Sequence, residues 1–152
     1  MQTVEMAARI DAPADLAWSI VGDFGSSALT RGYVARVETR GHGIGALRVY
    51  HLASHLGGGH VIERLERLDN HDRVIEYSMV DNGPLQWAEY RGHISVGAAG
   101  PDACVVLVRT QFCPIDPDDA DYAAMSRSNI GMYLDNVRAA VAEALERAIE
   151  SA

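Results

Sequence analysis

Two ionisable residues, Glu63 and Arg48, lie in segments that otherwise alternate between apolar and polar side chains. Glu63 shares its parity with Val61 and Leu65, and a carboxylate on an apolar strand face must be paired, hydrogen-bonded or shifted toward its neutral form. Arg48 is the obvious partner. The pair could orient a carbonyl or phenolate oxygen, or Glu63 could act as a general base in an enolisation or aldol-type step, with its pKa raised by burial. A structural ion pair that bridges two strands explains the same residues equally well.

Three histidines, His51, His55 and His60, lie close together in the chain and invite a metal-site interpretation. A His-x3-His spacing puts two ligands on one face only in a helix, and this segment has the pattern of strand and loop. We therefore expect no metal and no other cofactor. His55 and His60 flank the glycine run 57–59, so they are either solvent-exposed loop residues or groups that gate a ligand or supply a proton.

Hydrophobic periodicity predicts the elements that must position these residues. Alternation predicts a first strand over residues 2–10, and Pro13 with the apolar run after it predicts a short helix that ends near Phe24. Six more strands are predicted, separated by short loops dense in Gly, Asn, Asp and Pro, as in an antiparallel meander. Their expected ranges are 34–41, 45–53, 60–69, 73–80, 85–96 and 103–112.

The pattern changes to that of a helix at the end of the chain. Apolar residues recur at steps of three or four from Ile130 to Ile149, which predicts one long helix over 118–150. An antiparallel sheet of six or seven strands must bury one face against the apolar stripe of that helix. The expected fold class is therefore an α+β layer architecture.

Length and composition limit the function classes. The 152 residues, 48% hydrophobic and 22% charged, fit one compact domain over 1–152. All 13 basic residues are Arg, and 21 acidic residues give a net charge of -8, so we expect no nucleic-acid partner. No segment approaches about 18 uncharged apolar residues. We expect a cytoplasmic protein without stable membrane insertion, as a monomer or homodimer.

The order of elements resembles the helix-grip fold of the START and birch-pollen-allergen superfamily, also called SRPBCC. The resemblance rests on IDAPADLAWSIVGDF at 10–24, GALRVYHL at 45–52, ERLERLD at 63–69 and RVIEYSMVDNGP at 73–84. The nearest group is that of the polyketide cyclase/dehydrase and lipid-transport proteins. This resemblance implies a sheet curled around the last helix, with an internal cavity of roughly a few hundred cubic ångströms.

The segment 45–65 also resembles the plant abscisic-acid receptors of the same superfamily. There, Arg48 and Glu63 fall on positions that carry Arg and Glu, and residues 54–58 fall on the mobile gate loop over the pocket mouth. The receptors have Pro and Ala where Gly57 and Gly58 stand, and their His-Arg-Leu latch is replaced near residues 85–87. Hormone sensing therefore does not carry over to this chain.

The resemblance implies that Glu63 points into the cavity, and strand parity then selects other inward residues. In neighbouring strands, parity selects Tyr50, Leu52, Ile75, Tyr77, Met79, Ala88, Tyr90 and Gly92. Tyrosines suit a mostly hydrophobic ligand with a few oxygens, but the same tyrosines could instead be ordinary core residues. We assign catalytic roles to Glu63, Arg48 and Tyr90. Ligand contacts are expected from Tyr50, Leu52, His55, Leu56, Tyr77, Met79, Trp87, Asn129 and Tyr133.

Two functions follow from these residues and the resemblance. The favoured one is a cyclase or aromatase-like enzyme that folds a natural-product intermediate in the cavity and promotes ring closure or dehydration by positioning and acid-base catalysis. The alternative is a carrier, sequestration or self-protection protein that binds a hydrophobic ligand without turnover. The sequence does not separate them.

Overall fold

The computed structural model describes residues 1–85, 87–115 and 122–151. Within these residues the chain forms seven strands, two α-helices and one turn of 3-10 helix. In chain order they are β1 (Gln2–Ile10), α1 (Ala14–Val21), β2 (Val34–Arg40), β3 (Leu47–Leu52), η1 (Ser54–Leu56), β4 (His60–Asp69), β5 (Val74–Asp81), β6 (Trp87–Ala98), β7 (Cys104–Pro114) and α2 (Tyr122–Glu150).

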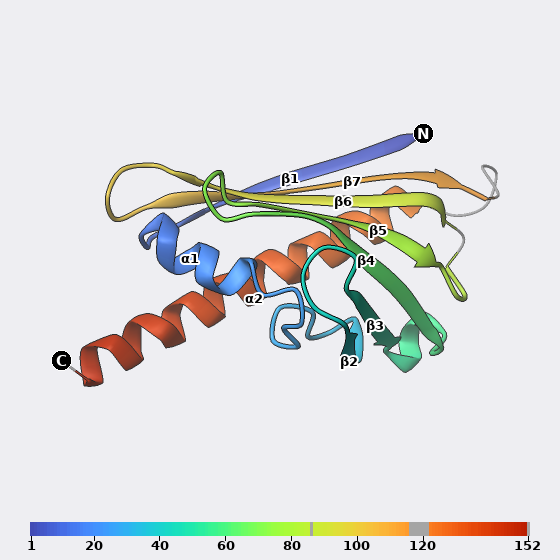
Figure 1. The fold of residues 1–152 in the computed structure, drawn as a ribbon, viewed down its shortest axis with the longest axis horizontal. Coiled ribbons are helices and arrows are strands. Elements are labelled where there is room, and N and C mark those ends of the chain that lie inside the picture. The colour runs from blue at the N-terminus through green and yellow to red at the C-terminus, as the bar shows by residue number, and fades with distance from the viewer. Residues whose placement is uncertain (86, 116–121, 152) are drawn as a thin grey trace.

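The strands form one sheet in the order β1-β7-β6-β5-β4-β3-β2, and every neighbouring pair is antiparallel. The sheet curves, and α2 crosses its concave side with α1 on that same side (Figure 1). Six of these strands follow one another as a meander, and β1 pairs with β7 at one edge. The α+β helix-grip architecture predicted from the sequence is confirmed.

The apolar stripe of α2 packs against the inner face of the sheet. Ile130, Leu134, Val137 and Val141 are buried as the periodicity predicted, and a fully buried side chain of this kind contributes about 1.5–3 kcal/mol. The prediction was wrong for Ile149, which is 76% exposed. The reason is visible in Figure 1, where the C-terminal end of α2 extends beyond the sheet. The predicted first residues of this helix, 118–121, lie outside the described residues.

A β-bulge near the start of β6 changes which side chains face inward. Parity placed Ala88 on the inner face, but Ala88 is exposed and Trp87 is buried. The pairing of β6 with β7 shifts register between Ala88 and Arg91, and Glu89 in that interval has a φ of 54°. An extra residue on one strand of a pair changes the face of the sheet toward which the neighbouring side chains point. As a result, Trp87 and Tyr90 both point inward.

Gly92 on β6 allows a close approach of Tyr77. The two residues are direct partners in the β5–β6 ladder. A Cβ atom built on Gly92 would overlap the ring of Tyr77, so this ring lies directly over the glycine backbone. Glycine therefore fixes the position of one inward tyrosine.

We predict that Gly92→Ala displaces the Tyr77 ring and lowers the free energy of unfolding by about 1–3 kcal/mol, as overpacking does in other cores. Gly97→Ala is the matched control, because Gly97 lies on the same strand and a Cβ there meets no atom within 4 Å. Urea denaturation followed by circular dichroism measures both variants. Equal stability of the two variants would contradict the steric role of Gly92.

Candidate ligand-binding site

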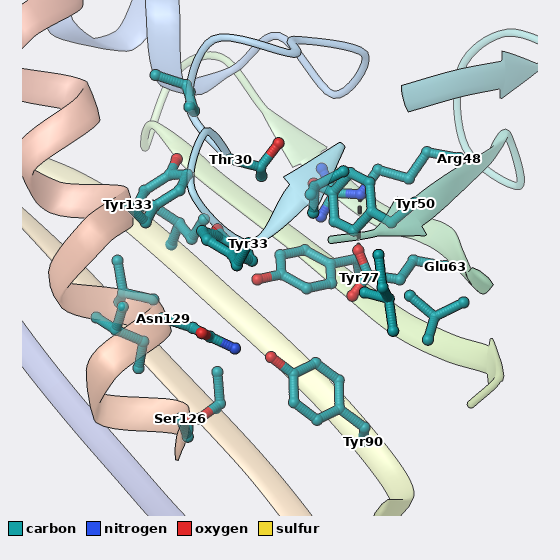
Figure 2. A pocket seen from close by; sticks show the side chains of 18 of the residues that line it. Thr30, Tyr33, Arg48, Tyr50, Glu63, Tyr77, Tyr90, Ser126, Asn129 and Tyr133 are labelled. Carbon is teal, nitrogen blue, oxygen red and sulfur yellow. Dashed lines mark hydrogen bonds and ion pairs between the residues drawn. The ribbon is translucent and has the colours of Figure 1, made fainter. Parts of the chain in front are cut away.

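A cavity of about 80 Å³ lies between the concave face of the sheet, α2 and the loop before β2. It is smaller than the few hundred cubic ångströms expected from the resemblance. The reason is that aromatic rings project into the space. Figure 2 shows Tyr77 and Tyr90 reaching in from the sheet, Tyr133 from α2 and Tyr33 from the loop before β2.

The most deeply buried charges of the site are Arg48 on β3 and Glu63 on β4, which are direct partners in the β3–β4 ladder. The Nε atom of Arg48 donates a hydrogen bond to Oε1 of Glu63 at 2.7 Å. The Nη1 atom donates to the backbone carbonyl of Phe24 at 3.1 Å. Arg48 is 8% exposed and Glu63 is 3% exposed. Both charges are thus largely removed from water, and each has a hydrogen-bonded partner.

Three aromatic rings surround the Arg48 guanidinium. Its Cζ atom lies 4.2 Å from the ring centroid of Phe24, 4.4 Å from that of Tyr77 and 4.7 Å from that of Tyr50. A cation over an aromatic face gains roughly 0.5–2 kcal/mol, more when the cation is desolvated. These contacts offset part of the desolvation cost of the guanidinium and fix its position.

Burial and the ion pair act in opposite directions on Glu63. Burial raises the pKa of the Glu63 carboxyl above its usual value, and the Arg48 charge and hydrogen bond lower it, with burial the larger effect. Burial also acts against the charged form of Arg48, but Tyr50 and Glu63 more than compensate, so the pKa of Arg48 is raised and the group remains a cation. The site therefore holds a fixed positive charge beside a carboxyl that accepts protons more readily than an exposed one.

The tyrosines around the cavity remain neutral. Burial is the main cause that raises the pKa of the hydroxyls of Tyr33, Tyr50, Tyr77, Tyr90 and Tyr133. A neutral tyrosine hydroxyl both donates and accepts a hydrogen bond. The wall of the cavity thus combines apolar ring surface with several hydroxyl groups, which suits a ligand of the same mixed character.

The loop between α1 and β2 is attached to α2 by one side chain. The Asn136 amide donates hydrogen bonds to the backbone carbonyls of Leu29 and Arg31, each at 3.0 Å. Thr30 lies between these two residues, and Tyr33 follows shortly after. This attachment places both Thr30 and Tyr33 in the cavity wall. Neither residue was predicted from the sequence, because residues 25–33 are mostly small and turn-forming and show no strand or helix period.

A second polar group joins β7 to α2. The hydroxyls of Thr110 and Ser126 are hydrogen-bonded at 2.8 Å, and both residues are buried. Asn129 lies one helical turn after Ser126, and Figure 2 shows both on the side of α2 that faces Tyr90. Thr110 and Ser126 were not predicted as site residues either. For Thr110 a signal existed, because it shares the parity of the apolar residues Val106 and Val108 on the same strand.

The structure brings ten of the twelve predicted site residues together around the cavity. These are Arg48, Tyr50, Leu52, Leu56, Glu63, Tyr77, Trp87, Tyr90, Asn129 and Tyr133. His55 and Met79 do not line it. The single turn η1 directs Leu56 inward and leaves His55 exposed, while Met79 is half-buried and packs against the neighbouring apolar clusters. The catalytic and ligand-binding roles themselves remain predictions.

The other predicted histidines belong to surface pairs. His51 is 2.8 Å from the Glu38 carboxylate, and His60 is 3.9 Å from that of Asp81. Among the described residues, no group of three or more His, Cys, Asp or Glu side chains is arranged to hold a metal ion. Neither described helix is long and apolar enough to cross a membrane.

The curved sheet, the long helix α2 and the largely apolar cavity between them define a helix-grip protein. A family model described as polyketide cyclase / dehydrase and lipid transport matches residues 1–150. The chain therefore belongs to the polyketide cyclase/dehydrase and lipid-transport family, as the sequence resemblance had indicated.

Solved structures support the same fold. The Zhui aromatase/cyclase from Streptomyces sp. R1128 is 19% identical, with 95% of each chain covered and a TM-score of 0.82. The XoxI protein from Bacillus cereus is 20% identical, with 93% of this chain and 96% of that chain covered and a TM-score of 0.80. Norcoclaurine synthase from Thalictrum flavum, in complex with dopamine and hydroxybenzaldehyde, is 20% identical, with 93% and 87% covered and a TM-score of 0.73. At these identities the likeness is one of fold.

We predict that Arg48→Met is strongly destabilising near neutral pH. It leaves the Glu63 carboxylate buried without a counter-charge, which typically costs about 3–5 kcal/mol. Loss of the Arg48 charge raises the pKa of Glu63 further. At pH values between the usual pKa of a glutamate and this raised pKa, the folded state therefore binds more protons than the unfolded state. The stability of the Arg48→Met variant relative to the native protein should therefore fall as the pH rises through the raised pKa, and it should recover in acid.

The matched control is Arg64→Met on the outer face of β4. Arg64 pairs with Glu66 at 2.8 Å, but both side chains are more than 40% exposed, and such surface pairs contribute about 0–1 kcal/mol. The double variant Arg48→Met with Glu63→Leu should recover most of the lost stability. Urea denaturation at a series of pH values tests all three variants, and a pH-independent effect of Arg48→Met would contradict the assignment.

Proposed function

We propose that this protein is a cyclase or aromatase-like enzyme that acts on a hydrophobic natural-product intermediate held in the cavity. The observation that carries the proposal is the buried Glu63 carboxyl in the cavity wall, whose pKa is raised by burial and which lies 2.7 Å from a fixed cation. A carboxyl with a raised pKa is a better general base at neutral pH than an exposed one. Membership of the family agrees with this activity.

The proposed step is an aldol-type ring closure. Glu63 removes a proton from a carbon next to a carbonyl group, and the negative charge that develops on the carbonyl oxygen is stabilised by Arg48. The resulting enolate carbon forms a bond to a second carbonyl carbon of the same molecule. The oxygen of that carbonyl takes a proton from the Tyr90 hydroxyl, and the proton held by Glu63 then returns to the Tyr90 oxygen, so that both side chains end in their starting protonation states. Loss of water from the product then gives the unsaturated ring.

A carrier or sequestration function is the second candidate, and one observation favours it. The Glu63 carboxylate already accepts a hydrogen bond from Arg48, and a carboxylate engaged in this way is a weaker base than a free one. In a carrier, the pair orients a ligand oxygen without any proton transfer. The two functions therefore use the same residues and differ in whether the ligand is changed.

Native mass spectrometry of the purified protein is the first test, because it shows whether a small molecule co-purifies. That compound is then incubated with the native protein and with Glu63→Gln. Because Glu63→Gln leaves the buried Arg48 charge without its counter-charge, circular dichroism first establishes that the variant is folded. For an enzyme, we predict that folded Glu63→Gln retains binding and reduces turnover by a factor of about 100 or more, as expected for loss of a general base. For a carrier, the compound is recovered unchanged from the native protein.

Glu66→Gln provides the control for this substitution. Glu66 lies on the same strand as Glu63, its side chain is exposed, and it is hydrogen-bonded to Ser78 and Arg64. The same chemical change there should leave turnover within about twofold of native, since surface substitutions usually have small effects. If Glu63→Gln turns over the compound at the native rate, Glu63 is not the base.

A further inference from the structure

Two buried side-chain polar atoms have no hydrogen-bond partner among the described residues: Oγ1 of Thr30 and Nε1 of Trp87. Both residues line the same cavity. A buried donor or acceptor left unpaired costs about 1–3 kcal/mol, so proteins seldom retain one without a reason. That both such atoms occur around one cavity indicates that a molecule bound there supplies their partners.

The indole of Trp87 is held by two neighbouring rings. It stacks on Tyr90, with ring centroids 5.0 Å apart and an interplanar angle of 12°, and it lies 5.3 Å from the ring of Phe112. Trp87 is 4% exposed. Rotation of the indole toward another partner would break both ring contacts. The other tryptophan differs, because Nε1 of Trp18 donates to the Asn70 side chain at 3.0 Å.

The chain adopts an unfavourable local backbone in the segment that turns Trp87 inward. The bulge between Ala88 and Arg91 contains Glu89 with a φ of 54°, a left-handed conformation that is uncommon for residues other than glycine. A regular strand would have placed Ala88 inward instead. The bulge therefore brings an indole with a free N–H group into the cavity wall.

The hydrogen-bond donors of Trp87 and Arg48 limit the chemistry of the ligand. An indole N–H only donates, so the ligand group that meets Trp87 is an acceptor oxygen. Arg48 has five N–H donors; its hydrogen bonds to Glu63 and Phe24 use two of them, and the Tyr77 hydroxyl accepts a further one. Arg48 lies on β3 and Trp87 on β6, three strands apart in the sheet. The two donors therefore act on different ends of a bound molecule.

We propose that the cavity binds a small aromatic compound with an acceptor oxygen at each end, one held by Arg48 and the other by the indole N–H of Trp87. The cavity volume of about 80 Å³ and its tyrosine-rich wall fit a single ring. This inference rests on the proposed function in requiring a ligand in the cavity, and the compound it names has the chemical class of the ring-closed, dehydrated product, not that of the open-chain substrate. Trp87 is the residue that determines specificity for the second oxygen.

The test compares two compounds by isothermal titration calorimetry. 4-Hydroxybenzaldehyde has a phenol oxygen and a carbonyl oxygen at opposite ends of one ring, and 4-ethylphenol has an ethyl group in place of the aldehyde. The chain contains no Lys, so no side-chain amine can form an imine with the aldehyde. The native protein should bind the aldehyde about fivefold or more tightly, the gain expected from one neutral hydrogen bond.

Replacing Trp87 by 3-benzothienylalanine keeps the bicyclic shape and removes the N–H donor. We expect this variant to bind the two compounds with nearly equal affinity, so the preference falls about fivefold. The same replacement at Trp18, outside the cavity, should leave the preference intact. If the Trp87 variant does not fold, Trp87→Phe serves for the same comparison.

The outcomes separate this inference from the proposed function. An unchanged preference in the Trp87 variant, or a native protein that binds neither compound, overturns the inference. The proposed function is tested independently by turnover of the co-purified compound in the native protein and in Glu63→Gln. A native protein that converts this compound but shows no Trp87-dependent preference retains the enzyme function and loses only the ligand class proposed here.

Discussion

The hydrogen bond between Arg48 and Glu63 is the constraint on which the rest of the site depends. Moving either charge alone into the interior costs several kcal/mol, so each requires the other. Their pairing joins β3 to β4, the carbonyl of Phe24 joins the loop after α1 to the same guanidinium, and the Tyr77 ring joins β5 to it. One cation thus determines the relative positions of four chain segments around the cavity.

The cavity itself results from a division of α2 into two parts. Toward its N-terminal end, the inward residues include Ser126 and Asn129, which are small or polar and leave space or hydrogen-bonding groups. Further along, Leu134, Val137 and Val141 are buried and pack tightly against the sheet and α1. Close packing in the second part holds the helix in place. The first part can then remain incompletely filled without loss of the fold.

Much of this architecture was predictable because strands and helices have short, regular periods. The alternation in residues 60–69 gave β4 its bounds and placed Glu63 on one face with Val61 and Leu65, and the resemblance implied that this face is the inner one. In the structure all three residues are buried. The β6 bulge was not predictable, because one extra residue reverses parity and no local composition signals it. Parity therefore selected Ala88 where the structure has Trp87.

The loop before β2 shows a second limit of sequence patterns. Thr30 and Tyr33 reach the cavity because Asn136, more than a hundred residues away along the chain, holds the backbone on either side of Thr30. A tertiary contact of this kind leaves no local period in the sequence. The size of the cavity could not be predicted from the sequence either, since it depends on how far several tyrosine rings project into one space.

The geometry around Arg48 explains why binding and catalysis are hard to tell apart at this site. Three rings pack around the guanidinium, so a ligand oxygen would have to approach in the guanidinium plane, where the N–H groups point. One edge of that plane is occupied by Glu63 and another by the Phe24 carbonyl. An oxygen bound there would lie close to the carboxylate. A ligand with an acidic C–H group beside its carbonyl would meet a base, and one without such a group would only be held, so the chemistry of the ligand decides between the two functions.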